Sequence, residues 1–444
     1  ELPLNGMMNG LEGKKIWICS LGCRSNQYEG EALANAFSGA GAELVDSPEG
    51  CDGAVLVSCT VTAMADKKCR QAVRRARRLS RNALVAACGC WAQKITREEA
   101  LSLGISIVVG NRRKGELPAL LARAFRKEIP SFVEDRVDVL RSREWDGLSL
   151  SRPLLHTRAF VKIQDGCDHF CSYCAIPYVR GFPVSRDPAD ILSEVERIAG
   201  SGCPEVVLTG VHLGLYGKFG SVSLAELVRR LASVEGLRRI RFGSLEPFGL
   251  DDELLETLAA SPRFCRHLHL PLQSGSGAVL ARMKRGYTPE EFLALAEKAR
   301  RFLGDDLHIS TDVLVGFPGE SEGDFDDTLS LMKACRFGKV HVFPFSPREG
   351  TAAWSFPDKI PRETVLRRTR EALSAADGLL AEFASRWVGS DVPVLVEETA
   401  ENSFQGLTPS FLRVVARGGA ERGEELPVRI TRISGDALRG RRVP

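Results

Sequence analysis

Three cysteines near the middle of the chain have the spacing of an iron–sulfur site. Cys167, Cys171 and Cys174 lie in the short segment GCDHFCSYC. Thiolates are preferred ligands of iron–sulfur clusters, and one loop can hold three corners of a cubane while the fourth iron stays open to a substrate or cofactor. A structural zinc site is the alternative interpretation, but it needs four closed ligands, and no second Cys/His pair follows at matched spacing. The pattern therefore predicts an open-sided 4Fe-4S cluster.

Three further cysteines stand where predicted strands end in the first part of the chain. These are Cys23, Cys59 and Cys90. The carboxyl ends of strands in a doubly wound sheet lie along one edge, so these side chains could converge despite their distance in sequence. Cysteines are also common in apolar cores. Geometry alone leaves a second metal cluster and a packing role equally open.

Polar residues follow several of the later predicted strands. Thr209, Glu246, Gln273 and Asp312 each stand at or near such a strand end. Side chains of these types can hydrogen-bond a ribose, an ammonium group or a base. Turn formation and strand-end capping explain the neighbouring glycines and prolines equally well.

Apolar runs separated by helical patterns occupy the first part of the chain. We expect strands over residues 14–23, 53–59, 83–90 and 105–110, with helices between them. Runs this apolar indicate parallel strands covered on both faces. The pattern predicts a doubly wound α/β domain over residues 14–126, followed by a linker over residues 127–152.

A second alternation of strands and helices fills residues 153–387. Six strand-like runs, each ending in glycine and polar residues, predict an open, partial (β/α)6 barrel with its chemistry at the carboxyl ends of the strands. A helix over residues 361–387 closes this domain. Short β-like segments with Gly-rich turns then predict a small β-barrel over residues 388–444, of a kind that binds nucleic acid.

Composition limits the class of protein. The chain is 44% apolar and 26% charged, as in soluble globular proteins, and has no apolar stretch long enough to span a bilayer. We expect no membrane association. The amino end lacks a secretory pattern, so we expect a cytoplasmic protein. Thirteen cysteines in such a protein indicate metal or redox chemistry, since disulfides are not expected there.

Arginines gather in two places. Residues 70–81 hold six arginines and no acid, and residues 411–444 hold eight arginines and four acids. Two basic patches could flank a polyanion such as RNA. Solvated surface faces explain the same pattern, and charge alone does not decide.

The central motif also resembles a known superfamily. The pattern C-x3-C-x2-C with an aromatic residue, Tyr173, before the last cysteine is similar to the radical S-adenosylmethionine (SAM) enzymes. The resemblance implies a 4Fe-4S cluster whose unique iron binds SAM, with Tyr173 near the adenine, although Tyr173 could equally be a core residue. It also favours SAM contacts for some of Thr209, Glu246, Gln273 and Asp312.

A narrower resemblance covers nearly the whole chain from Lys14. The segments LGCRSNQYE, SCTVT and GCWAQ resemble the signature of the methylthiotransferases. In that family the cysteines matching Cys23, Cys59 and Cys90 bind an auxiliary 4Fe-4S cluster. The last domain is similar to TRAM RNA-binding barrels.

The resemblance implies a particular reaction. SAM splits to a 5′-deoxyadenosyl radical that removes hydrogen from an unactivated C–H bond, and the auxiliary cluster supplies a methylated sulfur. Two SAM molecules, a flavodoxin- or ferredoxin-like electron donor and a sulfur donor are implied.

The implied substrate is adenosine 37 of tRNA. NQYE, TGVHLG and HLHLPLQSGS are similar to the branch that acts on threonylcarbamoyladenosine. Isopentenyladenosine 37 or a ribosomal-protein aspartate remain alternative substrates. A radical SAM enzyme whose second cluster only transfers electrons, and a non-catalytic iron–sulfur RNA-binding protein, remain alternatives of other classes.

Overall fold

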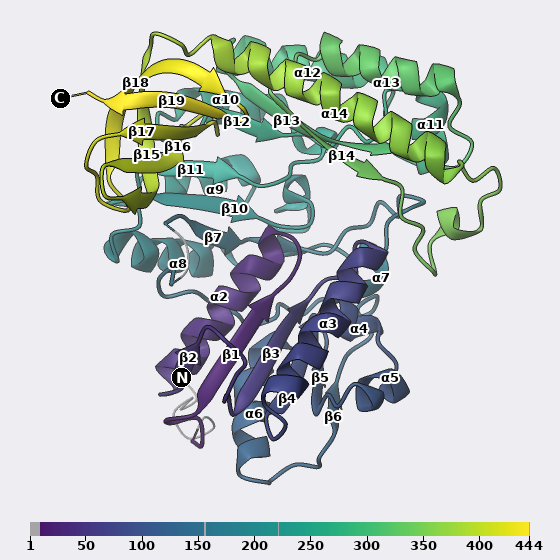
Figure 1. Cartoon of the computed structure of the whole chain (residues 1–444), viewed down its shortest axis with the longest axis vertical. Helices are drawn as coiled ribbons and strands as arrows, with labels where there is room; N and C mark the ends of the chain where they lie inside the picture. Colours follow the sequence, from purple (N-terminus) through teal and green to yellow (C-terminus); the bar gives the residue numbers. More distant parts are fainter. Residues whose placement is uncertain (1–8, 155–156, 221, 444) are drawn as a thin grey trace.

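A computed structural model describes residues 9–154, 157–220 and 222–443. It has three parts (Figure 1): an N-terminal α/β unit, a central half-barrel, and a small C-terminal barrel at the opposite end of the molecule from the N-terminal sheet. Within the described ranges, no helix is both long enough and apolar enough to span a membrane.

The N-terminal unit is built on a parallel sheet with the strand order β2-β1-β3-β4-β5-β6. Its strands are β1 (Lys15–Ser20), β2 (Glu43–Val45), β3 (Gly53–Ser58), β4 (Leu84–Gly89), β5 (Ile107–Val109) and β6 (Val133–Asp135). Its helices are α2 (Arg24–Gly39), α3 (Ala63–Leu79), α4 (Cys90–Lys94), α5 (Arg97–Ser102), the 3-10 turn η1 (Lys114–Glu116) and α6 (Leu117–Phe125).

Alternate residues of the sheet pack on opposite layers of helices. On β3, Val55 and Val57 join the cluster that includes α2 and α6, whereas Ala54 and Leu56 join the cluster that includes α3. All six residues of β3 are buried, as expected for a parallel strand covered on both faces. The doubly wound prediction is confirmed.

The predicted linker over residues 127–152 is wrong in part. Its strand β6 pairs in parallel with β5 and forms one edge of the sheet. Asp146 in the same segment is buried at 4% exposure. The strand has only three residues, none of them fully buried, so it leaves no apolar run in the sequence.

The half-barrel consists of six parallel strands in chain order. They are β7 (Ala159–Lys162), β10 (Glu205–Thr209), β11 (Arg239–Phe242), β12 (His267–His269), β13 (His308–Val315) and β14 (Lys339–Pro344). Two three-stranded sheets are joined by single bridges, Ile240 to Phe264 and Ser244 to His269. Among the described residues β7 and β14 do not pair with each other, so the barrel is open, as predicted.

Helices cover the outside of the half-barrel. They are α8 (Pro188–Gly200), α9 (Leu224–Leu231), α10 (Asp252–Ala260), α11 (Gly277–Met283), α12 (Pro289–Leu303) and α13 (Glu322–Ala334). Local capping fixes several starts: in α12 the Thr288 side chain and the Glu291 side chain form a reciprocal capping box.

The last part of the chain is a closed barrel with the order β15-β16-β17-β19-β18. Its strands are β15 (Asp391–Ala400), β16 (Ser403–Leu407), β17 (Arg413–Arg417), β18 (Glu425–Ser434) and β19 (Ala437–Arg442). The long helix α14 (Arg362–Ser385) contacts β13 and β14, and its last turns share an apolar cluster with the barrel through Leu380 and Phe383. The helix therefore fastens the C-terminal barrel to the half-barrel.

Candidate active site

The central cysteines lie in the loop between β8 (Gln164–Asp165) and the short helix α7 (Ile176–Arg180). The loop begins at Gly166, where φ is +77° and a Cβ atom would lie 2.1 Å from the Phe182 carbonyl oxygen. Only glycine fits this backbone. Burial, followed by the neighbouring Cys171, raises the pKa of Cys174 to about 12. This thiol is therefore protonated at neutral pH unless a metal takes the place of its proton.

The thiols fit an iron–sulfur cluster better than a single ion. All thirteen cysteines are free. Among the described residues, neither group of three brings its sulfur atoms within 4.8 Å of one another. One tetrahedral zinc ion at about 2.3 Å from each sulfur would need a closer group. A cluster binds each thiolate to a different iron atom, so it suits more widely separated sulfurs.

Two of the five predicted SAM contacts lie beside this loop. The guanidinium of Arg285 lies 3.4 Å from Cys171 Sγ and 3.5 Å from the Tyr173 hydroxyl, and it forms an ion pair with Glu246. Tyr173 also packs against the apolar cluster of Val279 and its neighbours. Tyr173 and Glu246 are therefore brought together by Arg285, which the sequence did not single out.

The three N-terminal cysteines follow adjacent strands. Cys23 caps the start of α2 after β1, Cys59 follows β3, and Cys90 begins α4 directly after β4. At Gly22 φ is +116°, and a Cβ atom would lie 2.6 Å from Cys59 Cβ. Burial, followed by the neighbouring Cys90 and Cys23, raises the pKa of Cys59 to about 12. The structure thus brings these three residues to one edge of the sheet.

Hydrogen bonds connect these cysteines to the half-barrel. The Cys23 thiol donates to Asn26 Oδ1 at 3.1 Å, and Asn26 Nδ2 donates to the Ser58 carbonyl at 2.8 Å. Arg180, at the end of α7, donates from Nε to Cys90 Sγ at 3.1 Å and from Nη2 to Asn26 Oδ1 at 3.3 Å. The helix that follows the central cysteine loop therefore reaches the second cysteine group.

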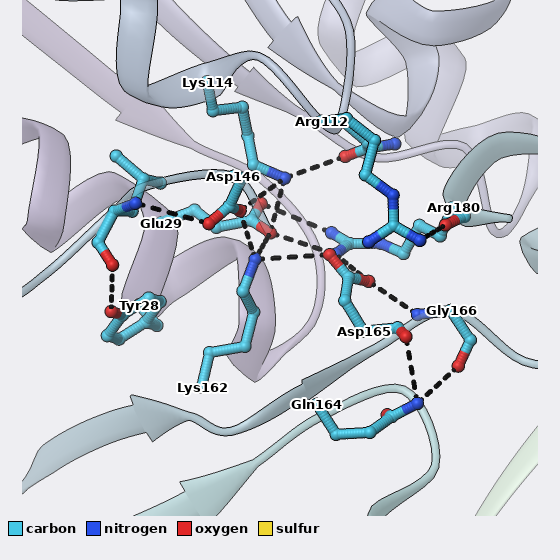
Figure 2. Close-up of polar contacts among 12 residues, drawn as sticks. Tyr28, Glu29, Arg112, Lys114, Asp146, Lys162, Gln164, Asp165, Gly166 and Arg180 are labelled. Carbon is cyan, nitrogen blue, oxygen red and sulfur yellow. Dashed lines mark hydrogen bonds and ion pairs between the residues drawn. The ribbon is translucent and has the colours of Figure 1, made fainter. Parts of the chain in front are cut away.

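Arg180 also belongs to a network of buried ion pairs between the N-terminal unit and the half-barrel (Figure 2). Its Nη1 lies 2.9 Å from both Glu29 Oε1 of α2 and Asp165 Oδ1 of β8. Lys114 pairs with Glu29 and Asp146, and Lys162 pairs with Glu29, Asp146 and Asp165. All six side chains of the network are at most 1% exposed.

The network balances its charges internally. Glu29, Asp146 and Asp165 are close enough to share one metal ion. Lys114, Lys162 and Arg180 supply three positive charges to these three carboxylates. Burial alone would raise the pKa of Glu29, but these cations hold it well below its usual range. This cluster is therefore a set of ion pairs that holds the N-terminal unit against the half-barrel, and not a metal site.

Two more of the predicted contacts, Thr209 and Asp312, line a cavity of about 640 Å³. Cys23 and Arg24 line the same cavity from the N-terminal unit, and Phe411 lines it from the C-terminal barrel. All three parts of the molecule therefore meet at this cavity.

Gln273 has a different position. Its φ is +72°, and its backbone N–H donates to the Asp312 carbonyl at 2.8 Å. Gln273 also forms an isolated parallel β-bridge with Val313. Its main chain holds the strand end, and it does not line the cavity.

Comparison with known proteins identifies the class first. Residues 161–332 match the model of the radical SAM superfamily, and residues 15–110 match the family described as "Uncharacterized protein family UPF0004". The radical SAM methyltransferase TsrM from Kitasatospora setae shares the fold, with a TM-score of 0.53 at 17% identity over 75% of each chain. The chain is a radical SAM protein.

Two curated relatives show to which family of radical SAM proteins the chain belongs. The chain is 36% identical to the threonylcarbamoyladenosine tRNA methylthiotransferase MtaB of Bacillus subtilis, over 90% of this chain and 89% of that protein. It is 33% identical to the tRNA-2-methylthio-N(6)-dimethylallyladenosine synthase of Syntrophotalea carbinolica, over 97% of this chain and all of that protein. The chain belongs to the radical SAM tRNA methylthiotransferase family and is an enzyme that modifies tRNA adenosines. The family implies SAM and a 4Fe-4S cluster.

Proposed function

We propose that this enzyme converts N6-threonylcarbamoyladenosine 37 of tRNA to its 2-methylthio derivative. The motifs of the first domain and the 36% identity to a relative named for this substrate support the choice. The observation that carries the proposal is the shared cavity: Cys23 opens into the same space as Thr209 and Asp312 at the strand ends of the half-barrel. A base held in this cavity lies between Cys23 of the N-terminal unit and the strand ends of the half-barrel.

The cysteines hold the two clusters in this proposal. Cys167, Cys171 and Cys174 bind the cluster that binds SAM, and Cys23, Cys59 and Cys90 bind the auxiliary cluster. When bound, these groups supply a hydrogen-abstracting radical and a transferable sulfur. Arg285, held by Glu246 and Tyr173, places a positive charge beside Cys171, and Arg180 places one beside Cys90, so each would offset the negative charge of a bound cluster.

The remaining predicted residues position ligands. We assign Tyr173, Thr209, Glu246 and Asp312 to contacts with SAM or substrate, and we assign Gln273 to positioning the strand end that carries Asp312. Thr209 and Asp312 face the cavity, so their side chains are available to a bound nucleoside.

The C-terminal barrel carries the RNA-binding surface in this proposal. A groove of about 670 Å³ on the barrel is lined by Arg417, Arg432, Arg439 and Arg441, with no acidic residue among its lining residues. None of these guanidinium groups has a hydrogen bond or ion pair with a described residue. Unpaired arginines are suited to backbone phosphates. On α3, the exposed Arg74, Arg75 and Arg78 form a second positive surface.

Two partners and a location complete the proposal. A flavodoxin- or ferredoxin-like protein supplies the electron, and a separate donor supplies the sulfur. The reaction takes place in the cytoplasm, where tRNA is modified.

Nucleoside mass spectrometry of tRNA from cells with and without the gene tests the proposal. The 2-methylthio derivative of threonylcarbamoyladenosine should disappear without the gene and return with the wild-type gene. Its persistence, together with loss of the methylthio-isopentenyl nucleoside, would reject the proposed substrate. Loss of neither nucleoside would place the activity on another substrate.

A further inference from the structure

The cavity shared by the three parts contains positive charges that form no ion pair with the described residues. Arg24 and Lys339 both line it. Within the described part of the chain, neither side chain has a hydrogen bond or an ion pair. The third lining cation, Arg413, donates to Gln405 at 2.8 Å and lies 4.0 Å from Asp436.

Arg24 stands among other cations. Its guanidinium lies 5.6 Å from the centre of the Phe411 ring, and those of Arg158 and Arg241 lie 5.6 Å and 4.9 Å from the same ring. The other two arginines have an anionic partner, since both pair with Glu205, at 3.7 Å and 2.8 Å. Arg24 is the member of this group that remains available to a ligand.

The surroundings of Arg24 favour an incoming anion. Arg24 is partly buried and shares the Phe411 ring with two further cations, Arg158 and Arg241. A partly buried, unpaired charge is costly, and a bound carboxylate would remove that cost.

The acidic and titratable groups around the cavity do not cancel this charge. Asp312 lies 3.3 Å from His269 Nε2 and attracts Arg24 from beyond ion-pair distance. Burial lowers the pKa of His308 to about 4 and also lowers that of His341, so both rings are neutral at pH 7. Arg24 and Lys339 therefore remain as unmatched cations in a space next to Cys23.

The two candidate nucleosides differ in the group that such cations bind. A threonylcarbamoyl group ends in a carboxylate, whereas a dimethylallyl group is neutral and apolar. We propose that Arg24, with Lys339, binds the threonyl carboxylate of the substrate and selects it over an apolar modification. The proposal rests on the proposed function and adds the group that recognises the substrate. A site built for a charged group rejects an analogue that leaves its buried charge unpaired.

Binding of anticodon stem-loop RNAs to the reconstituted enzyme tests this assignment. The wild-type enzyme should bind RNA bearing threonylcarbamoyladenosine about ten-fold or more tightly than RNA bearing unmodified adenosine. Arg24→Met should remove this preference, and Arg24→Lys should keep part of it. Arg413→Met is the matched control: this arginine lines the same cavity but has partners already, so the preference should remain.

A change in the RNA tests the same assignment with the protein unaltered, and it holds even if an Arg24 variant disturbs the nearby cysteines. A stem-loop whose threonyl carboxylate is converted to the neutral amide should bind the wild-type enzyme no better than unmodified RNA. Iron content and the unfolding midpoint of each variant check its integrity. An undiminished preference in Arg24→Met, or equal binding of acid and amide, overturns the role of Arg24. If such an enzyme still methylthiolates threonylcarbamoyladenosine, the proposed function stands without it, whereas modification of isopentenyladenosine alone rejects the proposed function itself.

Discussion

Buried arginines contact sulfur at both cysteine groups. Arg180 lies 3.1 Å from Cys90 Sγ, and Arg285 lies 3.4 Å from Cys171 Sγ. A donor to a cluster thiolate stabilises the thiolate and changes the reduction potential of the metal group. These two side chains therefore connect the folding of the chain with the chemistry of each cluster.

Replacing Arg180 should affect both stability and the auxiliary cluster. Arg180→Met leaves Glu29 and Asp165 short of a cation in a buried setting, which should cost about 3–5 kcal/mol in the free energy of unfolding. It should also lower the reduction potential of the auxiliary cluster, measured by electron paramagnetic resonance titration. The control is Arg229→Met, which removes half-exposed ion pairs with Glu226 and Glu253 and should cost much less. Equal losses in the two variants would contradict the role given to Arg180.

Removing the central cysteines should leave one cluster in place. A Cys167/Cys171/Cys174→Ala variant, reconstituted anaerobically, should keep about half of the iron and sulfide of the wild-type enzyme if Cys23, Cys59 and Cys90 bind the proposed auxiliary 4Fe-4S cluster. Cys265→Ala, at a buried cysteine away from both groups, should keep all of it. Absence of iron from the triple variant would argue against the auxiliary cluster.

At the scale of elements, β13 holds the C-terminal barrel through a neutral histidine. His308 Nδ1 donates to the Ser410 carbonyl at 2.5 Å, and the ring stacks on Phe383 of α14 at 4.7 Å. Its Nε2 is buried and has no partner among the described residues. Protonation would place a charged N–H group there without an acceptor, which disfavours the docked state.

This arrangement predicts a loss of stability in acid. The folded pKa of His308, about 4, lies below the ordinary value of 6.5, so the unfolded chain binds more protons between these pH values. The contribution of neutral His308 to the free energy of unfolding is complete above pH 6.5. About 2 kcal/mol of this free energy should be lost between pH 7 and pH 5. Urea unfolding of the wild type and of His308→Gln at both pH values measures it. The same pH dependence in both proteins would contradict the prediction.

The sequence predicted the long apolar elements and missed the short polar ones. The β3 and β4 strands were found because nearly all of their residues are buried. The strand β6 has no such run. The first turn of α2 carries polar residues, Ser25 and Asn26, that are buried only in the assembled molecule.

The cysteine groups could be predicted, but the arginines beside them could not. The spacing of Cys167, Cys171 and Cys174 is local, and the three N-terminal cysteines follow recognisable strands. Arg180, in contrast, acts on residues that precede it by 90 and 151 positions in the sequence. The contact between Arg180 and Cys90 depends on the packing of α7 against α4, which the sequence does not indicate.

For the whole molecule, the arginine groove on the C-terminal barrel should set the affinity for tRNA. Replacing Arg432 and Arg439 with Ala should weaken binding to all tRNAs, and the slope of log K against log salt should fall by about one for each phosphate that is no longer neutralised. Arg429→Ala is the control, because this arginine already pairs with Asp391. Filter binding over a range of salt concentrations measures both quantities. Unchanged affinity and slope in the double variant would remove the groove from the RNA interface.

The most direct measurement is a competition in one vessel. The reconstituted enzyme, SAM and a reductant are given equal amounts of tRNA bearing threonylcarbamoyladenosine 37 and tRNA bearing isopentenyladenosine 37, and the nucleosides are analysed by mass spectrometry. We predict the 2-methylthio derivative of threonylcarbamoyladenosine, formed together with 5′-deoxyadenosine. Methylthiolation of isopentenyladenosine alone, or cleavage of SAM without sulfur entering either tRNA, would contradict the proposed activity.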